Sequence, residues 1–167
     1  QLIHIKNITS LINTSDLEII DDNNMLVSSA GGIYDYNFSN SSSSSKAYID
    51  YTKNLKYVNI NQLATNKNKI WLLSNVPYGN IQILNHDYKL ENTIDWIDDF
   101  TEMKKIVFSD EYAFVVATKN NVDILLQYSV NEPEIYLNEY NNLSVSINNV
   151  ETSITTINDI IVIDEVL

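Results

Sequence analysis

The feature that most constrains the fold of this chain is an internal repeat with a period of about 45 residues. If Leu26, Trp71, Phe114 and Ile161 are taken as equivalent, they are 45, 43 and 47 residues apart. Each of the first three units has an apolar strand, a polar turn and a second apolar strand, over residues 25–36, 70–84 and 113–126. A period in the forties with two hairpin strands per unit is typical of a β-propeller blade.

The apolar runs favour strands over helices. They are four to six residues long, rich in Ile, Val, Tyr and Trp, and bounded by Asn, Asp, Gly and Ser. HEAT and armadillo repeats have a similar period but need long helical patterns. The best helix candidate, 94–108, lacks a clean 3.6-residue period.

Further apolar segments complete each unit to four strands. The predicted innermost strands are 8–12, 58–63, 103–108 and 150–157. The predicted outer strands are 47–51, 92–97 and 135–137. The serine-rich run 39–45 is expected to be an exposed loop, and a fourth hairpin is expected to begin at 159–163.

We therefore predict an all-β fold: a single partial β-propeller domain over residues 1–167, with about three and a half four-stranded blades of an incomplete ring. The units cover approximately 8–51, 58–97, 103–140 and 150–167. Because three and a half blades do not close a ring, the remaining blades are expected in sequence outside this chain, which we interpret as a fragment that stops within a unit.

Composition argues against several classes of partner. The net charge is −12, and all ten basic residues are Lys, scattered along the chain. Nucleic-acid binding and a polybasic membrane anchor both need a basic cluster, and membrane insertion needs about 18 consecutive apolar residues. The absence of Cys excludes disulfides, Cys-ligated zinc and thiol nucleophiles.

Candidate catalytic residues are few. The two His are His4, near the start of the sequence, and His86, in an Asn-His-Asp turn. Three acidic clusters could supply paired carboxylates, but each is expected to be a solvated turn: Asp21/Asp22, Asp98/Asp99 and Asp110/Glu111. The sequence therefore predicts no enzyme, no catalytic, cofactor-binding or metal-binding residue and no cofactor, and it leaves ligand-binding residues unassigned.

Aromatic residues offer a different lead, because Tyr and Trp suit both sheet packing and recognition of sugars or peptides. Trp71, on a predicted central strand, is expected in the core. Tyr78, in the turn between Pro77 and Gly79, is expected to be the most exposed aromatic residue.

The first unit resembles a known repeat family. Residues 30–37, Ala-Gly-Gly-Ile-Tyr-Asp-Tyr-Asn, resemble the Gly-Gly-Ile/Leu-Tyr-x-Tyr-Asp/Asn hairpin of two-component-regulator-type propeller repeats. Residues 22–29 look like the strand that precedes that hairpin, with Leu26-Val27 and Ser28-Ser29 in place of the family's Trp and Gly-Thr. Within the superfamily, the layout is most similar to the N-terminal propeller of the PorZ family, subunits of the type IX secretion sortase complex.

This resemblance implies a non-enzymatic binding or scaffold module of an exported protein, in the periplasm or at the cell surface of a Gram-negative bacterium. Protein partners and a surface glycan or lipopolysaccharide are the implied partners, and the acidic charge argues against an anionic ligand unless a cation bridges it. Two alternatives remain: a carbohydrate-active hydrolase or lyase built on a propeller, and the sensor ectodomain of a hybrid two-component regulator.

Overall fold

The structure is a computed structural model, and it describes ten stretches of the chain. They are 15–29, 32–37, 42–43, 49–50, 59–66, 69–75, 80–85, 87–94, 100–133 and 136–162. Within these stretches every regular element is a β-strand and there is no helix. The all-β prediction is confirmed for this part of the chain.

The strands form three antiparallel sheets and a separate hairpin. Sheet A contains β1 (Asp16–Ile19), β2 (Asn24–Ser29) and β3 (Gly32–Asn37), with the short β4 (Ser42–Ser43) and β5 (Ile49–Asp50) both paired to β3. Sheet B contains β6 (Ile60–Asn66), β7 (Lys69–Ser74), β8 (Asn80–Leu84) and β9 (Leu90–Ile94). Sheet C contains β10 (Phe100–Phe108), β11 (Tyr112–Lys119), β12 (Val122–Ser129) and β13 (Tyr136–Tyr140). The hairpin pairs β14 (Ser144–Ile147) with β15 (Val150–Ser153).

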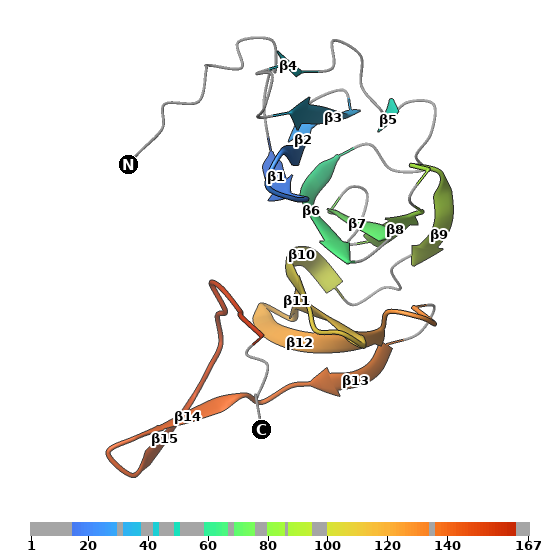
Figure 1. Cartoon of the computed structure of the whole chain (residues 1–167). Coiled ribbons are helices and arrows are strands. Elements are labelled where there is room, and N and C mark those ends of the chain that lie inside the picture. Colours follow the sequence, from blue (N-terminus) through green and yellow to red (C-terminus); the bar gives the residue numbers. More distant parts are fainter. Residues whose placement is uncertain are drawn as a thin grey trace, which may run out of the picture.

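The three sheets are arranged in chain order, with sheet A next to sheet B and sheet B next to sheet C (Figure 1). In each sheet the strands are ordered as in the sequence, and the first strands β1, β6 and β10 lie next to one another. The β14–β15 hairpin projects away from sheet C. Successive antiparallel sheets of four or five strands, arranged in this way, give a propeller-like fold.

The strand register agrees with the equivalence expected from the repeat. Leu26, Trp71 and Phe114, which the repeat makes equivalent, each lie on the second strand of a sheet. Each pairs with a residue of the first strand of its sheet: Glu18 with Leu26, Ala64 with Trp71, and Val107 with Phe114. The three predicted hairpins are β2–β3, β7–β8 and β11–β12.

Hydrophobic residues fill the spaces between sheets. One cluster joins sheets A and B, with Leu26 and Ile33 packed near Leu72. A second joins sheets B and C, with Trp71 near Tyr128. Because Trp71 and Leu72 point to opposite faces, sheet B is buried on both sides, which explains why β7 is an unbroken apolar run.

The structure differs from the sequence prediction in the fourth unit. Val150–Ser153 pairs with β14 in the hairpin instead of forming an innermost strand, and residues 154–162 contain no strand. Ile161, the expected central-strand residue, is 76% exposed. The prediction for 159–163 is therefore wrong over 159–162, because no strand among the described residues pairs with this segment.

Several other strand positions differ as well. The first strand of sheet A is β1, whereas the predicted innermost strand 8–12 lies outside the described residues. Ser42–Ser43 forms the short strand β4, so the expected serine-rich loop is interrupted by pairing with β3. The outer strands β9 and β13 are present but displaced by a few residues from 92–97 and 135–137.

Two hairpin turns consist of paired asparagines. Asn120 and Asn121 have φ of 51° and 64°, and Asn148 and Asn149 repeat the same pair of values. A two-residue turn with both φ positive matches the twist of the flanking strands, and Asn tolerates that conformation better than most residues.

Candidate functional site

The first strands of the three sheets line a groove of about 410 Å³. Its lining residues come from β1, β6 and β10: Asp16, Leu17, Glu18, Gln62, Leu63, Ala64, Thr65, Lys105, Ile106, Val107 and Phe108. In a propeller-like arrangement this is the edge that faces the axis.

Polar side chains in this groove connect one sheet to the next. Asp16 Oδ2 accepts a hydrogen bond from the backbone N–H of Leu63 at 2.9 Å. Gln62 Oε1 accepts one from the backbone N–H of Ile106 at 2.8 Å. Each bond joins the first strand of one sheet to the first strand of the following sheet.

These two bonds occupy the same place in the repeat. Asp16, Gln62 and Lys105 pair with the residues that lie two positions after Leu26, Trp71 and Phe114, namely Ser28, Leu73 and Val116, and we call this place the acceptor position. The next residues, Leu17, Leu63 and Ile106, form the amide position, because at Leu63 and Ile106 the backbone N–H donates to the preceding sheet.

Glu18 adds a further bond between sheets A and B. Its Oε1 accepts from Thr65 N at 3.3 Å and from Thr65 Oγ1 at 3.2 Å. Burial raises the pKa of Glu18 above its usual value of 4.5, although the hydrogen bonds from Thr65 act in the opposite direction.

On the far side of sheet C, a buried carboxylate holds segment 154–162. Asp123 is 3% exposed, and its carboxylate accepts hydrogen bonds from Lys104 Nζ at 2.8 Å, Thr118 Oγ1 at 2.7 Å and Ile157 N at 2.7 Å. Its own N–H donates to Thr155 O at 3.0 Å. Burial alone would raise the pKa of Asp123, but the three donors and the Lys104 charge bring it below its usual value.

Lys105, at the acceptor position of sheet C, forms an ion pair with Asp159 at 3.2 Å. An ammonium group has donors only, so Lys105 cannot accept an N–H as Asp16 and Gln62 do. The acceptor position therefore holds a hydrogen-bond donor in sheet C, and its partner is segment 154–162 in place of a following sheet.

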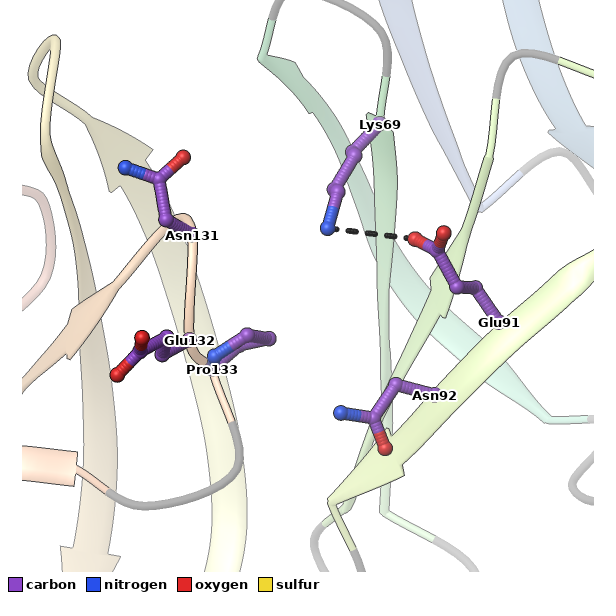
Figure 2. Close-up of a pocket in the computed structure, with 6 residues that line it drawn as sticks. All are labelled: Lys69, Glu91, Asn92, Asn131, Glu132 and Pro133. Atoms are coloured by element: carbon purple, nitrogen blue, oxygen red, sulfur yellow. Dashed lines mark ion pairs between the residues drawn. The ribbon is translucent and has the colours of Figure 1, made fainter.

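A second cavity, of about 490 Å³, lies between sheets B and C (Figure 2). Lys69, Glu91 and Asn92 line one side, and Lys69 Nζ is 3.2 Å from Glu91 Oε2. Asn131, Glu132 and Pro133, from the turn after β12, line the other side. We call this cavity the B–C cleft. Its lining offers amides, carboxylates and one ammonium, a set suited to hydrogen bonding with a polar ligand.

The acidic pairs considered in the sequence have the surroundings of turns. Asp21 Oδ1 accepts from the backbone N–H groups of Asn23 and Asn24 at 2.7 and 2.9 Å, in an exposed turn. Hydrogen bonds from Asn24 and Asn23 lower the pKa of Asp21. Asp110 and Glu111 lie in the exposed turn between β10 and β11. The pair at 98–99, both His residues and Tyr78 lie outside the described residues.

Trp71 is fully buried, as predicted. Its ring meets Phe108 and Tyr128 edge-on, at centroid distances of 5.5 and 6.2 Å. In the described stretches, no group of three or more His, Asp and Glu residues is placed to hold a metal ion.

Sequence reasoning missed the acceptor position and the B–C cleft. Asp16 and Gln62 could have been found by extending the repeat back from the central strands, since they recur with the same period. The cleft had no such signal, because Glu91 and Asn131 are brought together only by packing of sheet B against sheet C.

Comparison with known proteins assigns no family to this chain. No protein-family model and no curated protein matches the sequence. A solved structure described as Kluyveromyces lactis Hsv2 complete loop 6CD is similar with a TM-score of 0.48 and 14% identity, over 75% of this chain and 35% of the Hsv2 chain. The described residues include no helix of the length and hydropathy needed to span a membrane.

Proposed function

We infer that the chain is a non-enzymatic β-propeller module that serves as a binding and assembly scaffold. One observation carries this inference: the same inter-sheet hydrogen bond recurs from Asp16 to Leu63 and from Gln62 to Ile106. A bond repeated at equivalent positions fixes the angle between successive sheets, and uniform stacking of this kind is the basis of propellers and other repeat scaffolds. Sheets A, B and C are three blades of a ring in this proposal.

The setting we propose is an exported bacterial protein of PorZ-like type, acting in type IX secretion and attachment in the periplasm or at the cell surface. Support comes from the sequence of residues 30–37, which resembles the two-component-regulator-type propeller hairpin. The net charge of −12 disfavours an anionic lipopolysaccharide as the direct ligand. A protein or an uncharged surface glycan fits this charge better.

The B–C cleft is our proposed binding site for such a glycan. The side chains of Asn92 and Asn131 lie on opposite sides of it (Figure 2), and an amide both donates and accepts hydrogen bonds as sugar hydroxyls do. Glu91 and Glu132 supply further acceptors.

Nuclear magnetic resonance titration with an uncharged bacterial surface polysaccharide tests this proposal. We expect the side-chain amide signals of Asn92 and Asn131 to shift, and Asn131→Ala to weaken binding roughly tenfold, as loss of well-placed hydrogen bonds does. Asn141→Ala is the matched control, because Asn141 is exposed and is not among the residues that line the cleft. Equal binding by both variants would reject the cleft, and release of new reducing ends from the polysaccharide would instead favour the enzyme alternative.

A further inference from the structure

One side of β1 is much more exposed to solvent than the same side of β6 and β10. At the amide position, Leu63 is 1% exposed and Ile106 is 2% exposed, because each is covered by the preceding sheet. Leu17 occupies the same place in β1 and is 52% exposed. Ile19, two residues further along the same face, is 65% exposed.

The backbone of β1 shows the same difference. Ile20 N donates to Asn24 O of β2, and alternate N–H groups of an antiparallel strand point to opposite sides. The N–H groups of Leu17 and Ile19 therefore point away from β2, in the direction in which Leu63 N and Ile106 N meet the preceding sheet. β1 thus combines an apolar surface with backbone donors at an edge with which none of the described strands pairs.

We propose that this β1 edge, defined by Leu17 and Ile19, is a docking surface for one further four-stranded blade whose first strand carries a carboxylate or amide side chain at the acceptor position. The inference rests on the proposed propeller arrangement and adds the surface and the chemistry of its partner. The argument is continuity with two interfaces of the chain: both A–B and B–C place an acceptor side chain on the amide-position N–H of the next sheet and cover its apolar side chain.

A second copy of this chain fits the edge less well. The sheet it could present is sheet C, since A and B are already followed by other sheets. Sheet C carries Lys105 at the acceptor position, and an ammonium cannot accept the N–H of Leu17. The occupant therefore needs Asp, Glu, Asn or Gln at that place.

The test adds such a blade to the full chain. A second copy of residues 59–94, placed ahead of Gln1, supplies a sheet whose added Gln62 stands at the acceptor position. Amide hydrogen exchange at Leu17 should slow about fivefold or more relative to the unextended chain, the effect of one net hydrogen bond. Replacing only the added residue, Gln62→Lys, should restore fast exchange at Leu17, because Lys offers no acceptor.

Two outcomes overturn the docking surface. The first is unchanged exchange at Leu17 in the extended chain, whether the added sheet folds elsewhere or does not fold, because a blade matched to this edge should fold on it. The second is a concentration-dependent dimer of the unextended chain in sedimentation that Leu17→Asp abolishes, because the occupant would then be a second copy.

A separate variant distinguishes failure of this surface from failure of the propeller arrangement. In the unextended chain, Gln62→Lys should speed exchange of the Ile106 amide about fivefold and leave the Leu63 amide unchanged. If Ile106 exchange does not change, the inter-sheet bond and the proposed propeller are both wrong. If it changes while the extension fails to protect Leu17, only the docking surface is wrong.

Discussion

Asp123 lies near the start of β12 and forms hydrogen bonds with segment 154–162, which has no secondary structure. Its carboxylate accepts from Lys104, Thr118 and Ile157, and only 3% of the residue is exposed. A buried carboxylate with three donors is satisfied, whereas its removal would leave three partly buried donors without their acceptor. Asp123 therefore attaches segment 154–162 to sheet C through hydrogen bonds with Ile157 and Thr155, beside the more exposed ion pair between Lys105 and Asp159.

Asp123→Ala should destabilise the chain by about 2–4 kcal/mol, because it removes hydrogen bonds to a charged group and leaves Lys104 without its partner. The measurement is thermal unfolding together with exchange of the Ile157 amide, which should become fast. Asp159→Ala is the control, since the Asp159 side chain is 67% exposed and its loss should leave the melting temperature nearly unchanged. Equal effects of the two substitutions would contradict this assignment.

The pH dependence of the same contact has a defined sign. The pKa of Asp123 is lower in the folded chain than its usual value of 3.8. The stabilisation from Asp123 is therefore complete above about pH 4 and is lost as pH falls through the lower folded value. Exchange of Ile157, corrected for its intrinsic pH dependence, should show protection at pH 5 that disappears in stronger acid, and Asp123→Asn should abolish this transition.

Glu18 should behave in the opposite way. Its pKa is raised, so ionised Glu18 opposes folding, and this cost is present at neutral pH and disappears as pH falls below about 4.5. Glu18→Gln retains an acceptor for Thr65 and removes the charge, so it should be neutral or slightly stabilising at pH 7, by at most about 0.5 kcal/mol for a half-exposed group. Chemical denaturation at pH 7 and pH 4 measures the difference. A clear loss of stability at pH 7 would show that the charge itself is required.

At the scale of elements, two hairpins share a turn but differ in packing. β11–β12 lies inside sheet C, with Val115 and Leu126 fully buried, whereas all four residues of β15 are exposed. Both turns hold two Asn residues with positive φ. The turn residues therefore specify the hairpin geometry in both places, and packing alone decides how much stability each hairpin contributes.

Substitution of the second turn residue separates these contributions. Asn121→Val should lower the free energy of unfolding by about 1–2 kcal/mol, because a β-branched residue is strained at φ of 64° in a turn that sheet C cannot release. Asn149→Val introduces the same strain at the same φ in the exposed hairpin. It should open β14–β15 locally, with rapid exchange of its amides, and leave the global melting temperature unchanged. A matching global loss from both variants would mean that the exposed hairpin is part of the cooperative unit.

The sequence pattern predicted the central hairpins well and the edge strands less well. Ile70-Trp71-Leu72-Leu73 is apolar on both faces, and only a strand buried on both sides needs such a run. β1 alternates Asp-Leu-Glu-Ile, and its carboxylates make it look like a surface turn, although they bind the next sheet. Val150–Ser153 shows the opposite error, because the apolar Val150 suggested an innermost strand but lies in a solvent-exposed hairpin.

At the scale of the whole molecule, Trp71 connects two sheets. It lies on sheet B, and its ring contacts Phe108 and Tyr128 of sheet C edge-on. Large buried aromatic side chains contribute several kcal/mol, a substantial share of the 5–15 kcal/mol that typically separates folded and unfolded states.

Trp71→Ala should cost about 4 kcal/mol and unfold sheets B and C in one transition, because the cavity lies between them. Trp71→Phe, which keeps an aromatic ring at the site, should cost less than half as much. Denaturant unfolding followed by exchange of amides in β7 and β11 measures both effects. Loss of protection in β7 alone would contradict the shared core.

The sequence by itself determined the repeat, the class of fold and the pairing of neighbouring strands, because hairpin turns and apolar runs act over a few residues and leave local patterns. Tertiary structure decided which sheet follows which, where Asp16 and Gln62 find their donors, and that segment 154–162 attaches to Asp123 without forming a strand. Those bonds join a side chain to the backbone of a segment 34 to 47 residues away. Any residue except proline can supply such a backbone donor, so no local pattern marks it.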